Sequence, residues 1–300
     1  MKRLFTNLFV FVLLTGIIDY GVGLSGDYLQ RHAKGGKTKE FNDLVRNVPY
    51  DVVVLGSSRA LHHYDAPFLS DTLGFHVYNA GREGHGIILA EGILELVLQH
   101  SHPKLILYDV EPAFDIYSYP PDNHDKRYLA YLKAYAKDSA ISRIFKDVSM
   151  EEWMKVHFGM YRYNTSIITM LVDNLVARPS PENGYVPFGG VMENEPDSKV
   201  VLSDEIDPLK IEYAQRMISL AQSHDIPIAF VASPKYGERD SSELFPVRQL
   251  CERNQVPFWD FYAHPLFSGH KEWFQESVHL NGTGARVFSE MLVNNIHSIL

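Results

Sequence analysis

The sequence predicts an α/β fold in which a mostly parallel, five-stranded sheet lies between two layers of helices. From about residue 50 onward, short apolar runs alternate with segments that carry helical spacing or helix caps. The runs are apolar throughout, as is typical of parallel strands that are buried on both faces. Helical crossovers between successive strands are the connections that a parallel sheet requires. These observations together favour a three-layer α/β/α arrangement.

The expected strands are the five apolar runs, at residues 51–56, 75–81, 104–110, 226–234 and 257–262. Four helices are expected between and after them, at residues 84–100, 207–224, 241–254 and 281–300. The first helix is nearly apolar all round, which predicts that it is largely buried. The second opens with Asp207 as N-cap and Pro208 in its first turn. In the last helix Asn281 is the expected cap.

The remaining segments predict one domain behind an apolar leader. Lys2 and Arg3 precede an apolar stretch that ends at Asp19, so residues 1–24 are expected to be either a cleaved signal peptide or a membrane anchor. Small residues at 21–23 offer a weak cleavage site. A linker at 25–45 and a single domain at 46–300 follow, with a long insertion at about 115–200. The charge order places the domain outside the cytoplasm, on the periplasmic or extracellular face.

Composition and charge exclude several classes of function. The formal net charge is -9 and no cluster of Lys and Arg follows the leader, which argues against a nucleic-acid partner. The single cysteine, Cys251, excludes an internal disulfide and a cysteine zinc site, and a packing role is favoured over a reactive thiol. His62 and His63 are adjacent, so they are not expected to share a metal ion. We expect neither a metal nor an organic cofactor.

Polar residues follow the strands where a ligand would bind, because ligands of open parallel sheets bind outside the carboxyl ends of the strands. Ser57 and Ser58 come directly after the first strand and Gly56. Near the carboxyl terminus, Glu276 stands three residues before His279. A serine hydroxyl becomes a nucleophile when a base such as imidazole takes its proton, and a carboxylate can orient that imidazole. The sequence therefore predicts a serine-based site.

The blocks "GSS" at 56–58, "NAGREG" at 79–84 and "ESVHLNGTGA" at 276–285 resemble those of the SGNH/GDSL hydrolases. The resemblance covers the chain from about residue 50 to its end, apart from the insertion. The first and last blocks also resemble the membrane-anchored branch that includes polysaccharide O-acetylation proteins and the D-alanyl transfer protein of teichoic acid synthesis. The resemblance implies a flavodoxin-like sheet with a long insertion after strand three.

The resemblance also implies roles for individual residues. Ser58 corresponds to the nucleophile, His279 to the general base, and Glu276 takes the place of the aspartate that the family usually has. The backbone N–H groups of Ser58 and Gly84 correspond to the oxyanion hole. Arg59, Asn79 and Glu111 are further candidate contacts of the substrate or the oxyanion.

The third block departs from the family, which carries an asparagine donor where this chain has Asp109-Val110-Glu111-Pro112. An ionised glutamate cannot donate a hydrogen bond to an oxyanion. Two alternatives follow. Either another donor replaces the asparagine, with Arg59 as candidate, or Glu111 is turned away or paired with Arg59 or Arg82.

The hypothesis from the sequence is an exported esterase or acyltransferase that uses a Ser-His-Glu triad on acyl esters, O-acetyl groups of a cell-surface glycan being the expected substrate. The alternative is a catalytically inactive carbohydrate-binding or assembly protein with the same fold. A flavodoxin-like signalling module is a third reading, but it leaves the "ESVHLN" block without a role. Tyrosines of the insertion are consistent with either a carbohydrate groove or packing.

Overall fold

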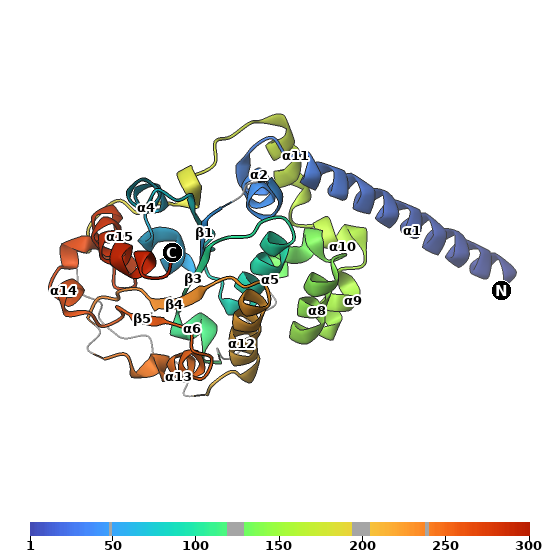
Figure 1. The fold of residues 1–300 in the computed structure, drawn as a ribbon. Coiled ribbons are helices and arrows are strands. Elements are labelled where there is room, and N and C mark those ends of the chain that lie inside the picture. The colour runs from blue at the N-terminus through green and yellow to red at the C-terminus, as the bar shows by residue number, and fades with distance from the viewer. Residues whose placement is uncertain (48–49, 119–128, 194–204, 238–239) are drawn as a thin grey trace. The chain divides into compact units, whose positions relative to one another are not determined.

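A computed structural model of the chain describes residues 1–47, 50–118, 129–193, 205–237 and 240–300. Its main sheet holds the five expected strands, all parallel, in the order β2-β1-β3-β4-β5 (Figure 1). Their bounds are β1 Val52–Gly56, β2 Val77–Asn79, β3 Leu105–Asp109, β4 Ile228–Ala232 and β5 Phe258–Asp260. The predicted fold class is confirmed. The order reverses between β1 and β3, which is the switch point where such sheets bind ligands.

Two layers of helices cover the sheet, one on each face. One layer consists of α3 (Ser58–His63), α4 (Ala66–Leu73) and α15 (Gly282–His297), and the other holds α5 (Ile87–Leu98) and α12 (Pro208–Ser223) (Figure 1). Alternate side chains of each strand point to opposite faces, so the two layers of helices pack against different residues of the same strands.

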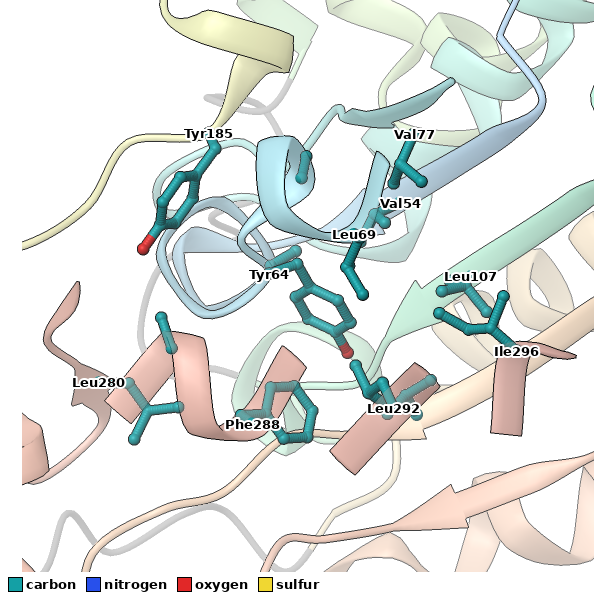
Figure 2. Close-up of a cluster of buried hydrophobic side chains, with 14 of the residues drawn as sticks. Val54, Tyr64, Leu69, Val77, Leu107, Tyr185, Leu280, Phe288, Leu292 and Ile296 are labelled. Carbon is teal, nitrogen blue, oxygen red and sulfur yellow. The ribbon is translucent and has the colours of Figure 1, made fainter. Parts of the chain in front are cut away.

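The core on the α15 side joins strand residues to the helices above them. Val54, Leu107 and Leu292 belong to one buried cluster, and the ring of Tyr64 meets that of Phe288 edge-on at 5.2 Å (Figure 2). All five side chains are fully enclosed. Burying a side chain of this size contributes roughly 1.5–3 kcal/mol, so this cluster fixes α3 and α15 over the ends of β1 and β3.

The helix ends follow the expected local chemistry. Asp207 caps α12 by accepting the N–H of Leu209 at 2.9 Å, and Asn281 caps α15 by accepting the N–H groups of Thr283 and Gly284 at 3.1 Å. The helix predicted from residue 84 begins three residues later. Gly84 has φ +68°, a left-handed conformation that interrupts a right-handed helix.

The contacts divide the chain into two compact units. Unit 2 joins Leu44–His124 to Pro181–Leu300 and contains the sheet with its helices. Its other elements are η1 (Asp43–Asn47, which begins at the last residue of unit 1), α6 (Pro112–Asp115), η3 (Glu182–Gly184), η4 (Ser242–Leu244), α13 (Phe245–Arg253), α14 (Pro265–Ser268), η5 (Lys271–Trp273), β6 (Phe274–Glu276) and β7 (His279–Leu280).

Unit 1 joins Met1–Asp43 to Asp125–Ser180 and is helical throughout its regular elements. They are α1 (Lys2–Arg31), α2 (Gly36–Asn42), η2 (Leu129–Tyr135), α8 (Ser139–Val148), α9 (Met150–Lys155), α10 (Gly159–Tyr163) and α11 (Ile167–Leu175). The stretch at 25–45, predicted as a linker, thus carries the end of α1 and all of α2. Parts of the predicted insertion, at 119–128 and 194–204, lie outside the described residues. The division into leader, linker and single domain stays a prediction.

Helix α1 is long and apolar enough to cross a membrane. Its most apolar window has a mean hydropathy of 1.9 and none of that window is buried. A signal sequence near an amino terminus has the same properties, so a signal peptide and an anchor both remain compatible with this helix.

Candidate active site

The turn from β1 into α3 separates the two serines that follow the strand. Gly56 has φ +145°, and a Cβ atom there would lie 2.8 Å from the carbonyl oxygen of Asp109, so a side chain does not fit. Ser57 is fully buried, and its hydroxyl accepts the N–H of Arg59 at 3.2 Å as the cap of α3. Ser58, the first residue of the helix, is half-buried. The turn therefore encloses one hydroxyl and leaves the other accessible.

A short hairpin presents the carboxylate and the imidazole together. Strands β6 and β7 are antiparallel, and Glu276 stands opposite His279 in their register. Ser277 and Val278 form the connection between them. Because directly opposite residues of a hairpin have neighbouring side chains, a spacing of three residues is enough to bring Glu276 onto the His279 ring. The longer side chain of glutamate is accommodated by this geometry.

The three side chains form a continuous hydrogen-bonded line. The Nε2 atom of His279 lies 2.7 Å from Oγ of Ser58, and its Nδ1 atom is hydrogen-bonded to Oε1 of Glu276. Since a carboxylate only accepts, Nδ1 carries the proton and Nε2 presents a lone pair to the serine hydroxyl. The structure thus places the Ser58 proton where the imidazole can take it.

The carboxylate of Glu276 is held in its ionised form. Burial by itself raises the pKa of Glu276, but the hydrogen bond from His279 and that from the N–H of Val278, at 3.1 Å, outweigh burial and keep the pKa below its usual value. The side chain of Glu276 is 47% exposed and that of His279 is 19% exposed. The hydrogen-bonded line from Ser58 to Glu276 therefore carries a negative charge at Glu276 and is partly open to solvent.

Aromatic rings enclose the His279 imidazole. His62 meets it edge-on at 5.6 Å, Phe188 at 5.4 Å and His63 at 6.2 Å. His62 also stacks on Phe188 at 3.7 Å, and its Nδ1 donates to the carbonyl of Val186 at 2.6 Å. Burial lowers the pKa of His62. These rings limit rotation of the imidazole away from Ser58.

A buried chain of hydrogen bonds fixes the hairpin to the sheet. The N–H of Leu280 donates to Nε2 of His63 at 2.9 Å, so Nδ1 of His63 carries the proton and donates to Oγ of Ser233 at 2.9 Å. The Ser233 hydroxyl donates in turn to Asp109 at 3.0 Å. Burial, with the positive charge of Arg59, holds the pKa of His63 well below its usual value, which preserves the acceptor on Nε2.

The aspartate at the end of this chain is deeply enclosed. Asp109 also accepts the hydroxyl of Tyr64 at 2.8 Å and the N–H of Ser233 at 3.0 Å. Burial raises the pKa of Asp109 to about 6, although Arg59 and these hydrogen bonds act in the opposite direction. Asp109 therefore ties the ends of β3 and β4 to helix α3.

The third block of the sequence is occupied by a buried ion pair. Arg59 is 1% exposed and donates through Nη1 to Glu111 at 2.6 Å and through Nη2 to the carbonyl of Ser233. The second of the two alternatives left open by the sequence, pairing of Glu111 with Arg59, is thus the one that the structure contains. The N–H of Glu111 donates to Asp115 at 2.6 Å. Burial raises the pKa of Asp115 to about 7.

Asn79 is likewise committed to internal partners. Its amide nitrogen donates to the carbonyls of Ala60, Leu61 and Tyr64, and its oxygen accepts the N–H of Gly81. Arg59, Asn79 and Glu111, the three candidate contacts of an oxyanion or substrate, thus each have a hydrogen-bond partner inside the protein. Their role as contacts of a ligand stays a prediction.

The backbone N–H groups predicted for the oxyanion hole are those of Ser58 and Gly84. Within the described part of the chain, the N–H groups of Ser58 and Gly84 have no hydrogen-bond acceptor. Space beside Gly84 is open, since a Cβ atom there would meet nothing within 4 Å. The assignment of these two groups to an oxyanion hole stays a prediction.

Sequence reasoning missed His63, Ser233 and the role of Asp109. Their adjacency was the reason not to expect a metal shared by His62 and His63, but it did not predict the separate partners of the two rings, Val186 and Ser233. The partner of His63, Leu280, lies 217 residues away along the chain, so no local pattern carries the information. Among the described residues, no group of three or more His, Cys, Asp and Glu side chains could hold a metal ion.

Comparisons with known proteins give structural matches only. No family model matches the chain, and no curated protein matches it. Solved structures that match include a proposed acylhydrolase from Bacteroides fragilis (13% identity, 91% of this chain, 97% of that one, TM-score 0.43) and an acetyl xylan esterase (11%, 82%, 99%, TM-score 0.41). Another is described as a proposed platelet activating factor from Streptococcus pneumoniae (12%, 98%, 99%, TM-score 0.42).

Proposed function

We propose that this protein is a serine-dependent acyl ester hydrolase or acyltransferase of the SGNH/GDSL type, with Ser58 as nucleophile. The observation that carries the proposal is the line from Oγ of Ser58 through His279 to the ionised Glu276, with 2.7 Å between Oγ and Nε2. A nucleophile, a base and an orienting carboxylate in this order are the recognisable arrangement of a serine triad, whatever the fold.

The geometry supports the following sequence of steps. As Oγ of Ser58 attacks the acyl carbonyl, Nε2 of His279 takes the hydroxyl proton, and Glu276 stabilises the imidazolium through Nδ1. The carbonyl oxygen becomes an oxyanion, for which the N–H groups of Ser58 and Gly84 are the proposed donors. The tetrahedral intermediate then collapses, and the departing alcohol receives the proton from Nε2.

A second half-reaction releases the acyl group from Ser58. A water molecule or a sugar hydroxyl gives its proton to Nε2 of His279 and attacks the acyl-enzyme carbonyl, which forms a second tetrahedral intermediate. Its collapse breaks the bond between the acyl carbon and Oγ of Ser58, and the proton on Nε2 returns to Oγ, which restores the serine hydroxyl. Water as acceptor makes the protein an esterase, and a sugar hydroxyl makes it a transferase. Half-exposure of Ser58 and His279 supports access by either acceptor.

The proposed substrate is an O-acetyl ester of a cell-surface glycan, met on the outer side of a membrane. This part of the proposal rests on the resemblance of the "GSS" and "HLN" blocks and on the apolar helix α1. Export and anchoring through α1 belong to the same proposal.

The test replaces each of the two neighbouring serines. Ser58→Ala should abolish both turnover of an activated acetyl ester and covalent labelling by a fluorophosphonate, with a loss in turnover of roughly 10⁴-fold or more. Ser57→Ala, the matched control, should keep labelling and most of the turnover, and should cost about 1 kcal/mol of stability as a lost helix cap. Equal turnover of Ser58→Ala and the wild type would remove Ser58 as nucleophile.

A second candidate is a binding or assembly protein that has the fold without the chemistry. The Arg59–Glu111 pair favours it, because it fills the block in which the SGNH/GDSL hydrolases carry an asparagine donor. This candidate predicts that the wild-type protein binds an acetylated glycan but is not labelled at Ser58 by the fluorophosphonate. Labelling that depends on Ser58 and His279 would exclude it.

A further inference from the structure

Helix α1 does not stop where its apolar stretch stops. The apolar residues end at Ile18, but the helix continues to Arg31, and its second half packs within unit 1 against α10 and α11. Residues 1–18 are exposed along their whole length, whereas Gly26 is buried. The helix thus has an unpacked apolar half and a packed half that belongs to a folded unit.

Asp19, at the boundary of the two halves, caps another helix. Its carboxylate accepts the N–H of Gly159 at 2.9 Å and that of Met160 at 2.8 Å. Helix α10 has no side-chain cap of its own, because Phe158 occupies its N-cap position. Capping by a side-chain oxygen stabilises a helix by about 1 kcal/mol. The start of α10 therefore depends on a residue of α1.

Close packing continues from Asp19 along α1. A Cβ atom on Gly159 would lie 2.6 Å from Cα of Gly23, and one on Gly26 would lie 2.2 Å from the ring of Tyr163. Only glycines permit this approach. Cleavage at the small residues 21–23 would remove Asp19 and break this packing, so the structure argues for a helix that is retained.

Two exposed apolar side chains belong to the helix start that Asp19 caps. Phe158, which precedes Gly159 in the sequence, is 60% exposed, and Met160, which follows it, is 48% exposed. The apolar stretch at 4–18 spans about 22 Å at about 1.5 Å per residue, less than the roughly 30 Å of a hydrocarbon core. A span this short is accommodated by local thinning of the bilayer, which brings the lipid boundary close to the residues that adjoin the apolar stretch.

We propose that α1 is an uncleaved anchor and that the first turn of α10 inserts Phe158 and Met160 into the boundary of the lipid bilayer. Asp19 tolerates this depth because its carboxylate is paired with two N–H groups. The partner of this surface is the bilayer itself. This inference does not depend on the proposed chemistry of Ser58.

The test places a fluorescent label at single cysteines in the full-length chain, inserted in phosphatidylcholine vesicles. Cys251, which is buried, is first replaced by alanine. The labelled variants are Phe158→Cys and Met160→Cys, with Leu175→Cys as control. Leu175 is 83% exposed, but its neighbour Asn174 contacts Leu29, about 15 Å further along α1 than Asp19.

Lipids that carry a spin label near the headgroup should quench the label at 158 and 160 several-fold more than the label at 175. Equal quenching at all three positions would overturn the lipid contact. The intact mass of the protein extracted from cell membranes gives the second readout, and it should include residues 1–24. A chain that begins after residue 21, 22 or 23 would overturn the retained anchor.

Discussion

Two sets of polar side chains lie around the turn from β1 into α3, and they differ in exposure and in their hydrogen bonds. The first set consists of Ser58, His279 and Glu276, and its side chains are partly exposed. The N–H of Ser58 has no acceptor among the described residues. The second set is buried, and its side chains are hydrogen-bonded within the protein. It consists of Ser57, Arg59, His63, Asp109, Glu111 and Ser233.

We call the buried set the frame, because it holds the chain in place, and the partly exposed set of Ser58, His279 and Glu276 the candidate site. Buried polar groups are costly when unpaired, so a buried set in which every side chain has a hydrogen-bond partner resists rearrangement, although Nε of Arg59 has none among the described residues. A group that is to meet a substrate must instead keep a free bond and a path to solvent. The hydroxyl of Ser57 belongs to the frame and that of Ser58 to the site, although the residues are adjacent.

After the loss of the nucleophile in Ser58→Ala, the largest effect is expected for Glu276→Gln. An amide in place of the carboxylate no longer stabilises the imidazolium and favours the wrong tautomer of His279, so kcat for an activated ester should fall by roughly 10³–10⁴-fold. The pair of His270 and Glu272 supplies a matched control. They are hydrogen-bonded at 2.6 Å and are exposed on the surface. Glu272→Gln should leave kcat unchanged, and an equal effect of both substitutions would show that the carboxylate at 276 has no special role.

Breaking the ion pair of the frame should cost stability. Arg59→Met leaves Glu111 buried without its cation, and the free energy of unfolding should fall by about 3–5 kcal/mol. Adding Glu111→Gln removes the uncompensated charge and should restore part of that loss. Urea unfolding followed by circular dichroism measures both variants. If the double variant is less stable than Arg59→Met, the pair is not the reason for the loss.

The sequence predicted the sheet well because its signals are local. Apolar runs located all five strands within two residues at most ends, and Asp207 and Asn281 marked helix starts that the structure contains. The parallel arrangement of the strands was predicted from the helical crossovers between them rather than from any single residue. The triad residues were identified by resemblance, and the structure brings Ser58, His279 and Glu276 together.

The frame could not be predicted, because its bonds join residues that are far apart in the chain. Arg59 reaches Ser233 across 174 positions, and His63 reaches Leu280 across 217. Neither pair has a spacing that local periodicity can detect. The second half of α1 was also missed. The small residues at 21–23 were interpreted as a weak cleavage site, whereas in the structure this part of α1 packs against Gly159, and Gly26 packs against Tyr163.

A smaller effect is expected when the frame loses His63. His63→Phe leaves the N–H of Leu280 without its acceptor, which should cost about 1–3 kcal/mol of stability. The hairpin that carries His279 is then less well placed, and kcat should fall by roughly 10–100-fold with little change in KM. His62→Phe keeps the stacking on Phe188 and should affect kcat less. Steady-state kinetics with an activated ester distinguish the two, and a fall in KM instead of kcat would contradict a positioning role.

The smallest effect concerns the pH dependence of stability. His63 is neutral in the folded protein because its pKa lies well below the unfolded value near 6.5, so its contribution is complete above that pH and is lost as the pH falls below it. Asp109 and Asp115 act in the opposite sense. Their pKa values are raised to about 6 and about 7, so stability due to their protons is lost as the pH rises from about 4 through those values.

Comparing the wild type with His63→Phe removes the contribution of Asp115, which is the same in both proteins, and leaves that of His63 together with any change at Asp109, which His63 reaches through Ser233. The stability difference between them should shrink as the pH falls from about 7 to about 5, by up to about 1.4 kcal/mol for each pH unit below the unfolded pKa. Urea unfolding at a series of pH values measures it. A difference that stays constant over this range would mean that His63 does not remain neutral in the fold, and the hydrogen bond from Leu280 would then need another explanation.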